Sequence, residues 1–163
     1  LDLLPKTQRQ DAINGHWAKA ELIDYLFATG VQAHFSPEVI TVVHDYPANQ
    51  AALAELCPDG QHAKRFEVFI GPVELANGYQ ELTDPKEQHA RFVADQHARE
   101  QHGLAVGPLD RRLLAALEQG MPACSGVALG VDRLIMLVLG IDTICETLTF
   151  GAHDSLALKN DPS

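Results

Sequence analysis

Apolar residues recur at helical spacing along several stretches of the chain. In residues 17–29, Leu22, Ile23, Leu26 and Phe27 fall on one face, while the charged residues lie elsewhere, which predicts an amphipathic helix. Capping residues, glycines and prolines mark the ends of the other periodic segments. They predict further helices at residues 7–14, 49–56, 84–102, 108–120 and 131–139, and a last helical turn at 141–146.

Short runs of β-branched and aromatic residues predict the strands. They lie at residues 39–44, 66–70, 73–82, 126–130 and 147–150. The Gly71-Pro72 turn joins two of these runs, so we expect an antiparallel hairpin there. The elements follow in the order helices, strand, hairpin, two helices, then strand and helix. This order predicts an α+β fold, an antiparallel sheet flanked by helices, in one domain over residues 1–163.

The second strand of the hairpin carries two acidic residues. Glu74 and Glu81 are seven positions apart, and this odd spacing puts side chains on opposite faces of a regular strand. The Asn77-Gly78 pair between them is a suitable place for a β-bulge, which shifts the register by one residue and turns both carboxylates to one side. With the bulge, the two carboxylates converge in an arrangement suited to Mg²⁺. Without it, one or both face water.

A strand rich in small residues runs into the last long helix. Gly126, Ala128 and Gly130 lie two apart, so one face of the strand is bare enough for a ligand or another backbone to approach closely. Arg133 stands at the start of the helix, and its guanidinium suits phosphate if it reaches back toward that face. The alternative is a surface arginine beside a buried helix.

Composition and charge narrow the classes of function. The 163 residues include 46% hydrophobic ones, enough for the core of one domain, and no apolar run has the length of a membrane span. The net charge of −10 and the lack of a basic run disfavour direct nucleic-acid binding. Without a membrane span or a charged-then-apolar leader, we expect a cytoplasmic protein. Three widely spaced cysteines match neither a disulfide framework nor a structural zinc site, so we expect reduced thiols. The sequence lacks the glycine patterns of P-loop and Rossmann nucleotide sites.

The motifs together resemble one family of enzymes. Residues 66–70 and 73–84, followed by Gln88 and Arg91-Phe92, resemble the late catalytic strands of class II lysyl-tRNA synthetases. Residues 126–137 resemble motif 3 of that class, with Arg133 as its arginine. Residues 121–130 are most similar to the elongation factor P lysine ligases, which are synthetase paralogues without an anticodon domain. Ala128 stands where lysyl-tRNA synthetases typically carry glycine, a difference that in this family goes with the use of β-lysine.

The resemblance implies a chemistry and a set of residues. Lysine or β-lysine would be activated by ATP, with Mg²⁺, as an aminoacyl-adenylate and then transferred to a lysine of elongation factor P. Glu74 and Glu81 would hold Mg²⁺ and the substrate amine, and Arg133 would clamp a phosphate. The other residues that the resemblance implicates are Leu75 and Gly130 at the ATP site, and Asn77, Ala128 and Ser125 at the substrate.

Two motifs of the class II synthetases are not found in this chain. Motif 1 forms the dimer, and motif 2 grips the α-phosphate and the adenine. The chain therefore resembles the C-terminal half of the catalytic domain, and we expect it to be inactive alone and to act in a longer polypeptide that forms a homodimer. Two alternatives stay open: a piece of a lysyl-tRNA synthetase that charges tRNA, and a synthetase-like binding module without catalytic activity.

Overall fold

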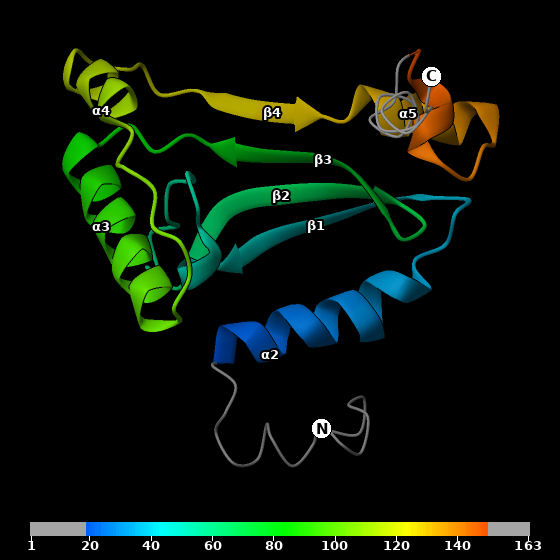
Figure 1. Cartoon of the computed structure of the whole chain (residues 1–163), viewed down its shortest axis with the longest axis horizontal. Coiled ribbons are helices and arrows are strands. Elements are labelled where there is room, and N and C mark those ends of the chain that lie inside the picture. Colours follow the sequence, from blue (N-terminus) through cyan, green and yellow to red (C-terminus); the bar gives the residue numbers. More distant parts are fainter. Residues whose placement is uncertain (1–18, 150–163) are drawn as a thin grey trace, which may run out of the picture.

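The computed structural model describes residues 19–149, which form an antiparallel sheet with helices around it (Figure 1). The four strands lie in the spatial order β1-β2-β3-β4. They are β1 Ile40–Pro47, β2 His62–Ile70, β3 Val73–Gln80 and β4 Ser125–Leu129. The predicted α+β fold and the predicted hairpin of β2 and β3 are confirmed.

The helices begin and end at residues with clear capping roles. They are α2 Lys19–Leu26, α3 Pro85–Gln101, α4 Arg111–Glu118 and α5 Val131–Leu139. The Asp84 side chain accepts hydrogen bonds from two backbone amides of the first turn of α3, and Pro85 takes the first helical position, as the sequence predicts. Gly140 ends α5 with φ at 65°, a left-handed conformation that favours glycine. Within residues 19–149, none of the helices combines the length and the apolar character that crossing a bilayer requires.

Two small clusters of buried side chains hold the sheet to its surroundings. Phe69 of β2 is buried and makes edge-to-face contacts with Phe27 and Phe35, which follow α2. A second cluster is built from small residues under the β1–β2 connection: Ala51, Ala54 and Ala63. The Phe69 cluster places the segment that follows α2 against one face of the sheet, near β1 and β2.

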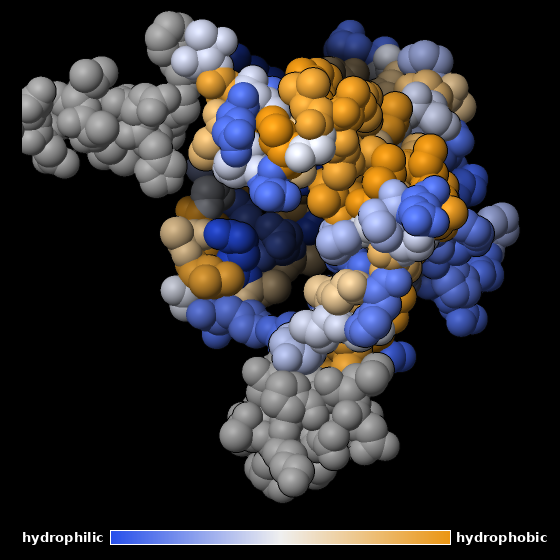
Figure 2. All heavy atoms as spheres, turned by 90° about the vertical axis from the view of Figure 1, so that its right-hand side faces the viewer, coloured by the Kyte–Doolittle hydropathy of each residue, from blue (hydrophilic) through white to orange (hydrophobic). Residues whose placement is uncertain are grey.

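The opposite face of the sheet is apolar and open. Strand alternation puts Ile40, Val42, Val127 and Leu129 on this face, and each of them is at least half exposed. Figure 2 shows hydrophobic side chains gathered on the side of the molecule that carries α5. An exposed apolar surface of this extent is typical of a region that packs against further protein.

Several predicted elements differ from the structure. Residues 49–56 do not form a helix: a 3₁₀ turn covers Ala48–Gln50, and Ala52 has a positive φ of 49°, which breaks any helical path. The helix expected from residue 108 begins only after Asp110, whose side chain caps it. Thr147 lies in a 3₁₀ turn instead of a strand. The predicted helix at 7–14 and residue 150 lie outside the described residues.

Candidate active site

The face of the sheet opposite the open apolar one carries most of the predicted site. Glu67, Asn77 and Ala128 lie side by side on β2, β3 and β4, and Tyr79 pairs with Gly126 one step further along. Because side chains on a strand alternate, all of these residues share one face. We call it the polar face.

A β-bulge in β3 brings Glu74 to this same face. Val68 pairs with Ala76 and Phe69 pairs with Glu74, so Leu75 is the extra residue. The prediction of a bulge at Asn77-Gly78 is therefore wrong by about two residues, since both of those residues pair regularly with β2. The carbonyl of the bulged Leu75 accepts a hydrogen bond of 2.8 Å from the amide of Gly130, where β4 ends. The bulged residue is therefore bonded to β4.

Glu74 and Glu81 share the polar face but lie at its two ends. Glu74 is near the end of β4 that leads into α5, whereas the amide of Glu81 bonds to the carbonyl of Cys124, which precedes β4. Seven strand residues span roughly 20 Å. Oxygen ligands of Mg²⁺ lie only about 2 Å from the ion. The two carboxylates therefore do not converge, and a single ion cannot be bound by both.

Arg133 anchors one end of the polar face. Its Nη1 donates a hydrogen bond of 2.8 Å to the Glu74 carbonyl and lies 3.7 Å from the Glu74 carboxylate. The stem of the arginine packs over Gly130, where an added Cβ would lie 3.4 Å from it. Arg133 therefore reaches across to β3 and places a guanidinium and a carboxylate together near the backbone of Leu75, whose own side chain is buried.

Glu81 occupies the other end, beside the small residues of β4. Its carboxylate fills the space next to Gly126, within contact distance of where a Cβ would be. Ala128 and Asn77 lie further along the same face. Ser125 does not join them, because it pairs with Gln80 and bonds to that side chain at 3.3 Å, on the opposite side of the sheet. Of the predicted substrate residues, Ser125 alone is placed apart.

The structure adds charged residues that sequence reasoning missed. Glu67 and Arg65 form an ion pair of 2.5 Å, with side chains only 12% and 17% exposed. The ring of Tyr46 lies over the guanidinium of Arg65. Burial, and then the neighbouring Glu67 carboxylate, raise the pKa of the Tyr46 hydroxyl. The signal in the sequence was the alternation of charged residues 65 and 67 with apolar residues 66, 68 and 70.

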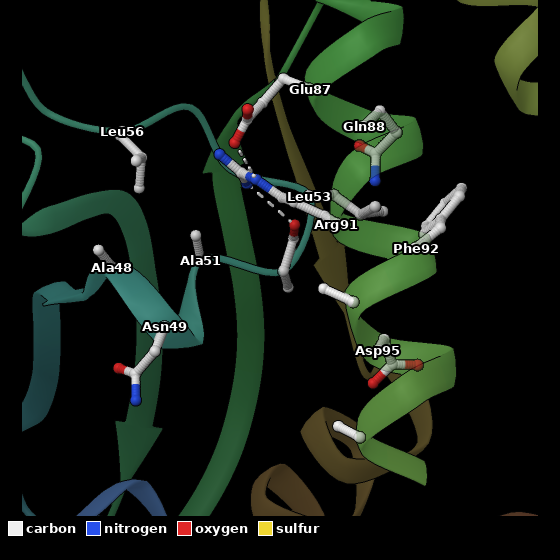
Figure 3. A pocket seen from close by; sticks show the side chains of 13 residues that line it. Ala48, Asn49, Ala51, Leu53, Leu56, Glu87, Gln88, Arg91, Phe92 and Asp95 are labelled. Carbon is white, nitrogen blue, oxygen red and sulfur yellow. Dashed lines mark hydrogen bonds and ion pairs between the residues drawn. The ribbon is translucent and has the colours of Figure 1, made fainter. Parts of the chain in front are cut away.

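Two hollows open near this region. One, of about 490 Å³, lies between α2 and the polar face and is lined by Asp24, Tyr46, Arg65 and Glu67 among others. A wider pocket of about 710 Å³ separates α3 from residues 48–56, and Figure 3 shows Arg91 bridging it. The wider pocket contains none of the predicted site residues.

Within residues 19–149, no three His, Cys, Asp or Glu side chains are grouped closely enough to hold a metal ion. Mg²⁺ in nucleotide sites is commonly held by one or two carboxylates together with phosphates. Glu74 pairs with Phe69, which lies two residues from Glu67 on β2. The carboxylates of Glu67 and Glu74 are therefore closer to each other than those of Glu74 and Glu81. Such a pair fits that kind of site.

Comparison with known proteins matches this chain to a family. The family model "tRNA synthetases class II (D, K and N)" matches residues 24–154. A protein of Proteus mirabilis named elongation factor P--(R)-beta-lysine ligase is 52% identical over 133 residues, which are 81% of this chain and 41% of that protein. Proteins of the same name from Klebsiella pneumoniae and Photorhabdus laumondii are 49% and 50% identical over 130 residues, 79% of this chain and 40% of each. The chain thus spans about two fifths of these relatives, and it belongs to the class II tRNA synthetases of the D, K and N group.

Proposed function

We propose that this chain is the motif 3 half of a ligase that joins lysine or β-lysine to a lysine of elongation factor P. The amino-acid carboxylate attacks the α-phosphorus of ATP, which forms the aminoacyl-adenylate and releases pyrophosphate. The acceptor amine then attacks the acyl carbon, the amide bond forms and AMP leaves. Close relatives that carry the name of this ligase support the proposal.

The observation that carries the proposal is the separation of charge along the polar face. Arg133 at one end is suited to a phosphate group, next to the backbone of Leu75 and Gly130. Glu81 at the other end, with Asn77 and Ala128 beside it, is suited to a substrate ammonium. A substrate that bears both an amine and a reacting carboxylate, aligned beside a nucleotide, fits this arrangement.

Mg²⁺ would bind at the end of the polar face that carries Arg133. Glu74 would hold it, and Glu67 from β2 is the carboxylate positioned to assist, whereas Glu81 is kept for the amine. The ion would neutralise charge on the triphosphate as pyrophosphate leaves. Arg133 contributes to the same end of the face by orienting the phosphates through its guanidinium.

The whole enzyme would be a longer cytoplasmic polypeptide that forms a homodimer. Its part upstream of this chain would supply motifs 1 and 2. The 163 residues alone would bind ATP weakly and would not activate lysine. Direct tRNA binding by this part is disfavoured by its net charge of −10.

The test is lysine-dependent exchange between pyrophosphate and ATP. We expect no exchange with the 163-residue chain. When the chain is joined to the N-terminal part of the Proteus mirabilis relative, we expect exchange, and both lysine and β-lysine are to be tested as substrates. Glu81→Gln in the joined protein should abolish exchange, while Arg112→Gln on the exposed surface of α4 should not. Transfer to tRNA instead of elongation factor P would favour the tRNA ligase, and no exchange in the joined protein would refute the proposal.

A further inference from the structure

Arg65 is held from several sides at the edge of the polar face. Its Nη2 contacts Glu67 at 2.5 Å, and its Nη1 donates a hydrogen bond of 2.8 Å to the backbone carbonyl of Gln50. The guanidinium carbon lies 4.5 Å from the ring centre of Tyr46 and 5.9 Å from that of Tyr79. A planar cation with two anchored nitrogens and an aromatic ring over it has little freedom to move.

Glu67 in turn fixes the side chain of Asn77. The Oε1 atom of Glu67, which contacts Arg65, also accepts a hydrogen bond of 3.2 Å from Asn77 Nδ2. An ionised carboxylate only accepts hydrogen bonds, so the amide of Asn77 must turn its NH₂ group toward Glu67. The carbonyl oxygen Oδ1 then points away from Glu67. That atom is buried and has no hydrogen-bond partner within residues 19–149.

An unpartnered buried acceptor is costly unless a ligand satisfies it. Asn77 lies opposite Ala128 and on the same face as Glu81, where the substrate amine is proposed to bind. An ammonium group carries three donors and no acceptor, so it complements Oδ1, whereas the NH₂ group of a flipped amide would repel it.

We propose that Arg65 is a positioning residue for amine recognition: it holds the Glu67 carboxylate in place, and Glu67 fixes the Asn77 amide with its carbonyl oxygen toward the substrate ammonium. This inference rests on the proposed function, because it takes an amine as the ligand. Without Arg65, the Glu67 carboxylate, which is only 12% exposed, loses its ion-pair partner and can rotate away from Asn77. The Asn77 amide then loses the acceptor that fixes its NH₂ group and can flip.

The test follows the Asn77 side-chain amide of the full 163-residue chain by NMR. In the unaltered chain, adding L-lysine at millimolar concentrations should shift the Asn77 Nδ2 resonances. Norleucine, which lacks the side-chain amine, and 6-aminohexanoate, which lacks the α-amine, identify the amine that binds. Arg65→Met keeps the apolar stem between the tyrosines and should weaken lysine binding about tenfold, the loss of one charge-assisted hydrogen bond.

Arg65→Lys keeps the cation but loses the two-pronged contact, so it should restore part of the affinity. Arg112→Met, an exposed arginine on α4, is the matched control and should bind lysine as the unaltered chain does. If Arg65→Met does not fold, Arg65→Lys alone tests the inference, because it should bind lysine more weakly than the unaltered chain does. The inference is overturned if lysine does not shift Asn77, or if the folded Arg65 variants bind lysine with unchanged affinity. Failure of the exchange reaction with intact lysine binding would count against the proposed function alone.

Discussion

The carboxylate of Glu81 occupies the space that a side chain at Gly126 would need. Glu81 directly follows β3, Gly126 lies on the adjacent strand β4, and a Cβ built on Gly126 falls within contact distance of Glu81 Oε1. Gly126 has no positive φ, so its backbone conformation does not require glycine. The glycine is therefore needed for space, and it sets where the Glu81 carboxylate can lie.

Gly126→Ala should displace the Glu81 carboxylate and weaken lysine binding, because the ammonium loses its anionic partner. The carboxylate is the far end of a flexible side chain, so folding should be retained. We expect an affinity about tenfold lower and an almost unchanged melting temperature. Gly107→Ala is the control, since a Cβ there meets nothing within 4 Å. Equal lysine affinity of the two variants would contradict the interpretation.

Gly78→Ala should instead destabilise the fold. A Cβ at Gly78 would overlap the ring of Phe66 and lie 2.9 Å from the carbonyl oxygen of Gly126, and a backbone atom cannot rotate away. Overpacking of this kind costs about 1–3 kcal/mol. Denaturant unfolding measures the loss, and combining the change with Phe66→Leu should recover part of it. Full stability of Gly78→Ala would show that the hairpin adapts more than the geometry allows.

Local signals predicted the start of α3 and the end of α5. The Asp84 cap of α3 and the glycine that ends α5 depend on neighbouring residues, so the sequence alone was sufficient. The bulge was predicted in the right strand but at the wrong residue. The bulge lies at Leu75, whose carbonyl bonds to the amide of Gly130, a residue distant in the sequence. Local propensity cannot contain that information.

The candidate site was predicted only in part for a related reason. Strand spacing alone could have shown that Glu74 and Glu81 are too far apart for one ion, since seven residues span roughly 20 Å. The contribution of Arg65 and Glu67 could not be derived that way. It depends on which face of β2 meets Asn77, and pairing between strands decides that.

Arg91 attaches α3 to the β1–β2 connection, and its removal should loosen that helix. Nη1 of Arg91 donates hydrogen bonds to the carbonyls of Ala52 and Ala54, at 3.1 and 2.7 Å, and Nε pairs with Glu87 (Figure 3). We expect Arg91→Met to lower the free energy of unfolding by about 2 kcal/mol. Hydrogen exchange of the α3 amides should rise with it. Arg112→Met should change neither quantity, and unchanged exchange in Arg91→Met would contradict the attachment.

The raised pKa of Tyr46 makes stability depend on alkaline pH. Burial is the first cause and the Glu67 carboxylate the second, and both disfavour the phenolate. The folded state therefore keeps its proton at pH values where the unfolded chain, with the ordinary tyrosine pKa of 10.0, has lost it. The sign follows from linkage: the contribution of Tyr46 is complete below pH 10 and is lost as pH rises above that value, because ionisation then favours the unfolded chain.

Tyr46→Phe isolates this effect, because it removes the titrating hydroxyl and keeps the ring that lies over Arg65. Denaturant unfolding at several pH values between neutral and strongly alkaline conditions should give similar stabilities for both proteins near pH 7, where the phenol is neutral in both states. Above pH 10 the stability of the unaltered chain should fall more steeply than that of the variant. Absorbance of the phenolate should show one tyrosine fewer ionising with unfolding in the variant. Parallel pH curves would mean that Tyr46 ionises freely in the folded chain, which would contradict the effect of its burial and of the Glu67 charge.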